Sequence, residues 1–148
     1  MTDRERPDSS HTRPDGVTDS TVAAVGKLSE ALETVERARG HLYGFHQLMG
    51  HADLQVEQAA TMLRAAGHSE LAARIESELV GRNVAEGRWT FQLVEEFDDG
   101  YWTELRTLET EVRDTLVVGR RHLFEAESKE ARRTRGRRGH EARPVQDG

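Results

Sequence analysis

The sequence predicts an all-α protein, an antiparallel up-and-down bundle of about four helices. Apolar residues recur every three to four positions through most of residues 20–130, which is the period of one helix face. No segment alternates β-branched and polar residues as a half-buried strand would. The expected connections are short, and short connections join antiparallel neighbours. At 148 residues, the chain has the size of one domain.

The four expected helices are residues 20–49, 53–66, 69–97 and 100–130. Gly50 is expected to end the first helix, because a helix C-terminus favours the left-handed conformation that glycine adopts freely. Asp53 and Ser69 are suitable N-caps for the second and third helices, since their side-chain oxygens can accept from free backbone N–H groups. The sequence DDG at 98–100 is typical of a turn and separates the third helix from the fourth.

Both ends of the chain, residues 1–19 and 131–148, are expected to be disordered, which leaves residues 20–130 as the helical bundle. They contain few apolar residues and cannot bury enough surface to offset the entropy of ordering. Residues 20–128 carry 11 Lys/Arg and 19 Asp/Glu, whereas residues 129–148 carry 7 and 3. The acidic body argues against a specific nucleic-acid partner. The basic C-terminal tail is suited to a weak anionic partner.

The composition restricts the compartment and the chemistry. The sequence contains no cysteine, which excludes a disulfide framework and a thiolate ligand or nucleophile. It has no apolar run of signal-peptide length, and none approaches the roughly 20 residues of a membrane span. We therefore expect a cytoplasmic protein with no membrane partner.

Charged residues interrupt the apolar face of the expected third helix. On a helical wheel, Arg82 and Glu86 fall within one arc of apolar residues. That arc consists of Ile75, Leu79, Trp89, Leu93 and Phe97. Arg39 and His46 fall in the same way within the apolar stripe of the first helix. Because an unpaired buried charge costs several kcal/mol, these polar groups should find partners.

Three interpretations of these polar groups stay open. In the first, Glu86 pairs with Arg82, or with a base of the first helix, in an internal network that fixes helix register. In the second, Arg39, His46, Arg82, Glu86 and Trp89 line a pocket for an anionic ligand. Arg39 or Arg82 would hold the anion there, with Glu86 and His46 as an acid/base pair. The third is a partly solvated interface.

No pattern in the sequence predicts catalysis or a cofactor. Neither a P-loop nor a dinucleotide-binding glycine motif is present. His41, His46 and His51 are five residues apart and cannot share one helix face. His122 and Glu125 have the reverse order of the Glu-x-x-His pair of di-iron bundles and would need ligands from other helices. We assign no catalytic residue, metal or cofactor, and favour a protein that is not an enzyme.

Two stretches, VGKLSEALETVERARGHLYGFHQLMGHADL and GRNVAEGRWTFQLVEEFDDGYW, resemble a family of small helical proteins of unassigned function in actinobacteria. The resemblance covers about residues 22–143 and includes GHEARP near the C-terminus. It implies a cytoplasmic protein of a GC-rich bacterium and supplies no catalytic residue.

The expected helix lengths predict self-association. The second helix is shorter than the third and fourth, so the hairpin over 84–112 should project, unless the first helix bends at Gly40 or Gly44 and covers it. The residues expected to form a homodimer interface are Phe91, Leu93, Phe97, Trp102, Leu105 and Leu108. We therefore expect a non-enzymatic helical scaffold or assembly protein. The alternative is a small-ligand-binding bundle with a polar pocket around Arg82, Glu86 and His46.

Overall fold

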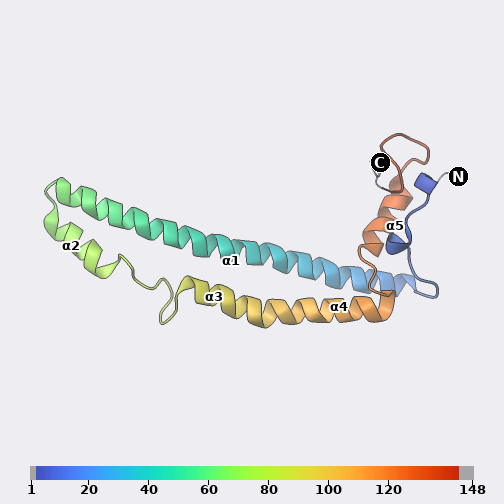
Figure 1. Ribbon diagram of the computed structural model, residues 1–148, viewed down its shortest axis with the longest axis horizontal. Coiled ribbons are helices and arrows are strands. Elements are labelled where there is room, and N and C mark those ends of the chain that lie inside the picture. Colours follow the sequence, from blue (N-terminus) through green and yellow to red (C-terminus); the bar gives the residue numbers. More distant parts are fainter. Residues whose placement is uncertain (1–2, 144–148) are drawn as a thin grey trace. The chain divides into compact units, whose positions relative to one another are not determined.

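The computed structural model describes residues 3–143 and confirms the all-α fold (Figure 1). Its α-helices are α1 (Asp19–Ala65), α2 (Ser69–Glu78), α3 (Thr90–Phe97), α4 (Thr103–Val117) and α5 (Leu123–Arg132). A π-helical turn, η3 (Asp98–Trp102), lies between α3 and α4, and two short 3-10 helices, η1 (Asp3–Glu5) and η2 (Ser9–His11), precede α1. Residues 1–2 and 144–148 of the two expected tails lie outside the described residues.

The chain divides into two compact units. The first unit contains Met1–Thr34 and Glu104–Gly148, and the second contains Val35–Thr103. The helix α1 contributes residues to both. The expected up-and-down order concerns the whole chain and stays a prediction.

The prediction that the first helix ends at Gly50 is wrong. Gly50 and the expected N-cap Asp53 both lie inside α1, which continues to Ala65. An interior glycine costs only about 1 kcal/mol relative to alanine, so one glycine does not break a helix whose flanking residues are good helix formers. A Cβ atom added at Gly40, Gly44 or Gly50 would meet no heavy atom within 4 Å, so none of these glycines marks close packing.

Alanine substitutions should distinguish the continuous helix from a broken one. Gly50→Ala is expected to raise the free energy of unfolding by about 0.5–1 kcal/mol, because the new methyl group has space and the unfolded chain loses freedom. Gly26→Ala serves as the contrast, since its Cβ would lie 3.0 Å from the Cβ of Phe124. Urea denaturation measures the free energy of unfolding of both variants. Destabilisation by Gly50→Ala would indicate a helix end at this residue.

The expected third helix is wrong in its middle part. Between α2 and α3 lies an irregular connection, residues 79–89, visible in Figure 1. Gly81 and Gly87 have φ angles of 74° and 71°, in the left-handed region that favours glycine. An isolated antiparallel bridge joins Ala85 to Arg88, on either side of Gly87. The helical wheel that placed charged residues among apolar ones therefore does not apply to this segment.

The expected fourth helix is divided in a similar way. Val118, Gly119 and His122 have φ angles of 55°, 71° and 55°, and these residues separate α4 from α5. The Gly119 N–H group donates to the Arg113 carbonyl oxygen at 3.0 Å, and the Arg113 side chain donates to the Gly119 carbonyl oxygen at 2.8 Å. These bonds satisfy backbone groups at the end of α4.

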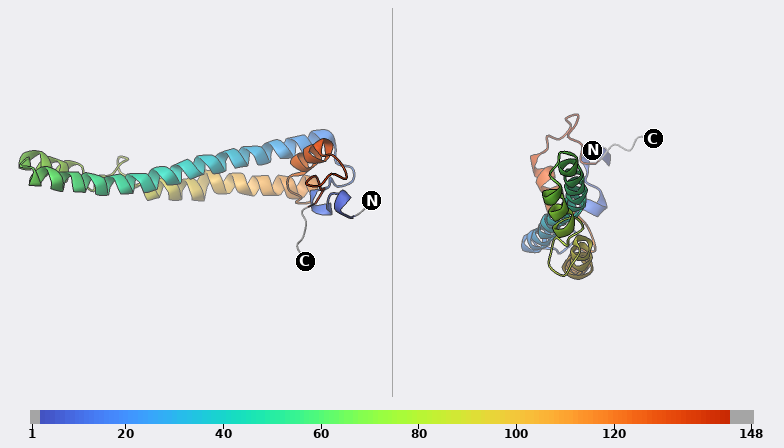
Figure 2. Two further views of the ribbon diagram at one scale, coloured as in Figure 1. Left: turned by 90° about the horizontal axis from the view of Figure 1, so that it is seen from above. Right: turned by 90° about the vertical axis from the view of Figure 1, so that its left-hand side faces the viewer.

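A small apolar core holds the first unit together. The start of α1 and α4 lie side by side in the views of Figures 1 and 2. The buried core consists of Val22, Val25, Val117 and Leu123, with Val17 and Val112 packed against it. Val17 belongs to the segment expected to be disordered, so part of that segment contributes to the core of this unit.

Residues of both expected tails also form ion pairs in the first unit. The Arg13 Nε atom lies 2.9 Å from the Glu127 Oε1 atom of α5. The guanidinium of Arg133, just after α5, is fully buried and pairs with both Glu5 and Glu130. These ion pairs raise the pKa of the Arg133 guanidinium through its hydrogen bonds to Glu130 and Glu5.

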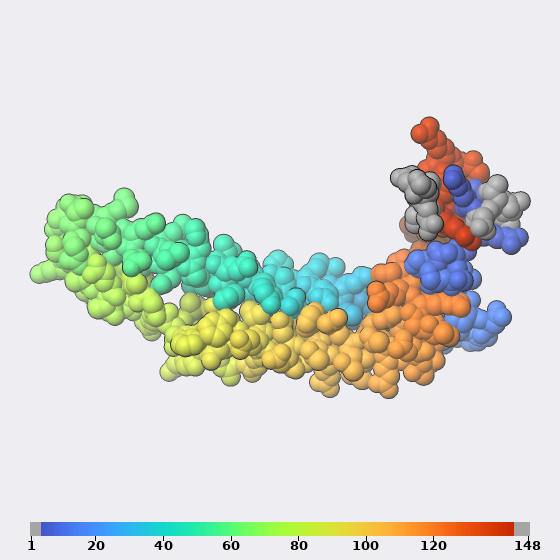
Figure 3. All heavy atoms as spheres, viewed as in Figure 1, coloured from blue at the N-terminus to red at the C-terminus, as the bar shows by residue number. Residues whose placement is uncertain are grey.

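The second unit has few buried side chains. Its buried hydrophobic residues are Ala60, Ala72 and Val94. In Figure 3 the atoms of α2 and of the C-terminal end of α1, both green, lie against each other. Ala60 and Ala72 are fully buried on these two helices, so small side chains let α1 and α2 approach closely. Most large apolar residues of the unit remain exposed.

Candidate interaction groove

The second unit contains an open groove of about 1140 Å³. One side is α1 between Met49 and Val56, and the other is the connection together with the start of α3, between Leu79 and Phe91. We refer to these residues as the groove. The connection forms the second side of the groove. Its backbone is irregular and does not continue the helix α2.

Hydrogen bonds hold the connection at both of its ends. The carboxylate of Asp53 on α1 accepts from the Gly81 N–H group at 2.9 Å. At the other end, the His46 Nδ1 atom lies 2.7 Å from the Thr90 hydroxyl oxygen. The Gln92 side chain also accepts from the Trp89 N–H group at 2.9 Å, which caps α3. These hydrogen bonds therefore fix both ends of the connection that forms one side of the groove.

The groove presents an apolar surface to solvent. Trp89 is 55% exposed and Phe91 is 40% exposed, and their ring centroids lie 5.1 Å apart. Leu79 and Val84 of the connection are also exposed. Contiguous exposed apolar residues of this size are typical of a surface that binds a partner or a ligand.

Arg82 and Glu86 line the groove as exposed residues. The prediction that Glu86 lies in the interior, paired with Arg82 or a base of the first helix, is therefore wrong. Within residues 3–143, neither side chain has an ion pair or a hydrogen bond. The connection contains glycines with positive φ and is not helical, and both charged side chains are exposed to solvent. Neither charge therefore has to lose its hydration.

Arg39 belongs to a different cluster. Its guanidinium forms two hydrogen bonds to the Asp98 carboxylate, at 2.7 and 3.0 Å, and lies 4.0 Å from the centre of the Trp102 ring. The hydroxyl of Tyr43 donates to the same carboxylate at 3.3 Å. The hydrogen bonds between Arg39 and Asp98 raise the pKa of Arg39 and lower that of Asp98. This pair links α1 to η3 and leaves Arg39 outside the groove.

The structure thus separates the residues that the sequence grouped as one site. The groove contains Arg82, Glu86, Trp89 and Phe91, and His46 reaches it only through Thr90. Of the other expected interface residues, Leu93, Phe97 and Trp102 are half-buried in the second unit. In the first unit, Leu105 is half-buried and Leu108 is exposed on α4.

Sequence reasoning missed Asp53, Leu79 and Val84 as groove residues. The sequence predicts that the Asp53 carboxylate accepts from the N–H groups that begin a second helix, whereas it accepts from the Gly81 N–H group of the connection. The available signal was the pair of glycines at 81 and 87, which favours a connection over a continuous helix.

No protein-family model, curated protein or solved structure matches the chain. The resemblance to actinobacterial helical proteins stays a prediction. None of the helices in residues 3–143 combines the length and the apolar character needed to cross a bilayer. Fold and groove together define the class: an all-α protein with an exposed apolar groove.

Proposed function

We propose that the protein is a non-enzymatic helical scaffold that forms a homodimer through the groove of its second unit. The observation that carries this proposal is the imbalance between buried and exposed apolar residues in that unit. Only two alanines and one valine are buried hydrophobic residues there. The exposed large ones are Phe45, Leu48, Leu54, Met62, Leu71, Leu79, Val84, Trp89, Phe91 and Tyr101. A unit of this size needs more apolar burial than its own core supplies.

The charges of the groove favour a second copy of the chain as the partner. Arg82 and Glu86 have opposite charges, lie on the same connection and have no ion-pair partner within residues 3–143. In a two-fold interface, Arg82 of each copy can face Glu86 of the other, because such an interface is self-complementary. The aromatic pair Trp89 and Phe91 would occupy the apolar centre, with the charges at the rim.

Charge reversal tests this arrangement. Arg82→Glu alone and Glu86→Arg alone should each raise the dimer dissociation constant about tenfold, since each places like charges opposite each other twice. The double variant should restore the affinity. Sedimentation velocity over a concentration series measures all three, with Arg138→Glu and Glu111→Arg as charge-matched controls. A wild-type monomer at micromolar concentration, or a double variant as weak as the single ones, would refute the proposal.

A small-ligand-binding groove is the second candidate function. It is favoured by the presence of Arg82, Glu86 and Trp89 in one groove, although ligand pockets are usually more enclosed and of about 300–1,000 Å³. Native mass spectrometry of the purified protein separates the two functions. A dimer mass without a retained molecule supports the scaffold, whereas a monomer with a retained small molecule supports ligand binding.

A further inference from the structure

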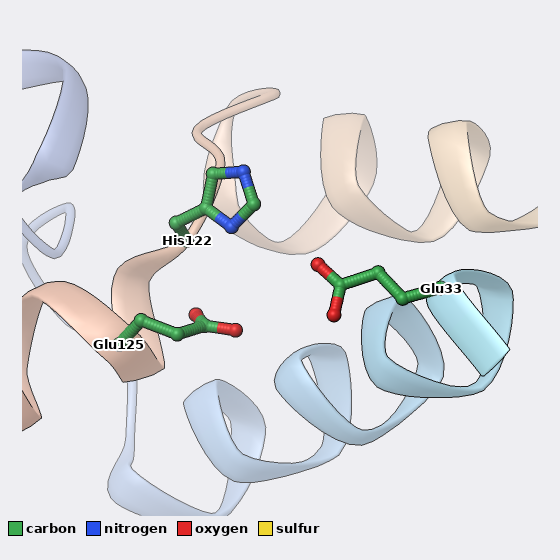
Figure 4. Close-up of side chains that lie close together, drawn as sticks. All are labelled: Glu33, His122 and Glu125. Carbon is green, nitrogen blue, oxygen red and sulfur yellow. The ribbon is translucent and has the colours of Figure 1, made fainter. Parts of the chain in front are cut away.

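Three metal-ligating side chains converge in the first unit, and none of them is a residue of the groove. Glu33 lies on α1, His122 lies just before α5, and Glu125 lies in the first turn of α5 (Figure 4). Their ligand atoms all lie within 4.8 Å of one another, and all three residues are exposed. Figure 4 shows the two carboxylates pointing toward each other beside the imidazole ring.

We propose that these side chains form a binding site for a divalent transition-metal ion, with Zn²⁺ as the best fit. Zinc binds imidazole nitrogen and carboxylate oxygen at about 2.0–2.2 Å, and three protein ligands plus water complete a tetrahedral site. At that bond length neighbouring ligand atoms are about 3.4 Å apart. The ligand atoms now lie within 4.8 Å of one another, and metal binding requires the two exposed glutamate side chains to rotate to the shorter spacing. The imidazole disfavours Mg²⁺ and Ca²⁺, which prefer oxygen ligands.

Arginines already occupy several other carboxylates of the unit, but not these two. Glu109, Glu127 and Glu130 each pair with an arginine. Within residues 3–143, by contrast, neither Glu33 nor Glu125 has a side-chain hydrogen bond or ion pair. Two like charges this close repel each other, and a shared cation converts that repulsion into attraction.

The backbone positions the imidazole before any ion binds. His122 has a φ of 55°, and its carbonyl oxygen accepts from the Ala126 N–H group at 2.8 Å, in the first turn of α5. Arg106, Arg113 and Arg121 line the same hollow as Glu33, and their positive charge lowers the affinity for a cation. We therefore expect binding in the micromolar range rather than tighter.

Isothermal titration of the full chain with ZnCl₂ tests the site. The wild-type protein should bind one equivalent that MgCl₂ does not replace. Glu33→Gln and His122→Asn should each weaken that equivalent at least tenfold. Asparagine tolerates the left-handed conformation, so the substitution at 122 preserves the backbone. The matched controls Glu57→Gln and His51→Asn lie in the second unit and should bind Zn²⁺ within about twofold of wild type.

Thermal unfolding followed by circular dichroism supplies a second readout. Zn²⁺ should raise the melting temperature of the wild type and of both controls, because an ion that binds only the folded state stabilises it. It should leave Glu33→Gln and His122→Asn unchanged. The sequence contains 7 histidines, so Zn²⁺ binding at other positions is a real alternative. Unchanged affinity in both site variants, or no wild-type binding at about 100 µM Zn²⁺, would overturn the proposal.

Discussion

Replacing Phe91 with glutamate is expected to convert the proposed homodimer into a monomer. Phe91 lies in the groove beside Trp89, and a two-fold interface would bury this side chain from both copies. Phe91 is 40% exposed, so burial of the remaining surface contributes about 1 kcal/mol per copy, and its loss from both copies raises the dissociation constant about 30-fold. The new carboxylate adds repulsion from Glu86, which lines the same groove. Sedimentation equilibrium at micromolar concentration measures the change.

Val118→Glu is the control for this experiment. Val118 is 71% exposed and lies in the first unit, so the substitution adds the same charge at an apolar surface residue outside the groove. Far-ultraviolet circular dichroism should give equal helicity for both variants. An unchanged dissociation constant for Phe91→Glu would place the interface on another surface.

Replacing Glu109 with glutamine should cause a large loss of stability in the first unit. Glu109 is 6% exposed and accepts hydrogen bonds from the Ser29 hydroxyl and from the Arg113 Nε atom, each at 3.0 Å. Glutamine keeps the shape of the side chain but leaves the half-buried Arg113 without its counter-charge. We expect the free energy of unfolding to fall by about 2 kcal/mol at neutral pH. Urea denaturation measures it.

The pH dependence shows whether the charge of Glu109 is the cause. Burial alone would raise the pKa of Glu109, but hydrogen bonds from Arg113 and Ser29 outweigh burial and lower this pKa. A carboxyl with a lowered folded-state pKa stabilises the protein above its unfolded pKa, and this contribution is lost as the pH falls through the folded pKa. The difference between wild type and Glu109→Gln should therefore shrink below about pH 4.

Two further results bear on this explanation. Glu111→Gln, an exposed position on the same helix, should change the free energy of unfolding by less than about 0.5 kcal/mol. If Glu109→Gln loses the same free energy at neutral and acidic pH, packing rather than the ion pair explains its effect.

The all-α class could be predicted from the sequence, whereas the helix ends could not. The apolar period is a local property and appears wherever a helix is amphipathic. Glycine has a different role in each context: Gly50 lies inside α1, while Gly81, Gly87 and Gly119 adopt positive φ and lie outside helices. Tertiary contacts such as the bond from Asp53 to Gly81 help to fix these conformations. A glycine alone therefore does not define a boundary.

The candidate groove was predicted in part, by reasoning that the structure corrects. The sequence groups Arg82, Glu86 and Trp89 because charges interrupt an apolar period, and it assigns Phe91 to the expected homodimer interface. The structure places all four in one groove. Their expected burial was wrong, since the connection is not helical. The convergence of Glu33 with His122 depends on the packing of α5 near α1, which no local pattern contains.

In the first unit, residues 4–6 form hydrogen bonds with residues 133–143, so the two ends of the described chain lie next to each other. The Ala142 N–H group donates to the Arg4 carbonyl oxygen at 3.0 Å, and the Arg143 side chain donates to the Arg6 carbonyl oxygen at 2.7 Å. A short peptide could therefore join residue 3 to residue 143, because hydrogen bonds already hold the neighbouring residues close together. Circular permutation can then move the chain ends into the exposed connection at 83–84 while every ion pair around Arg133 is kept. The contacts that hold this unit together thus do not depend on the order in which the helices are synthesised.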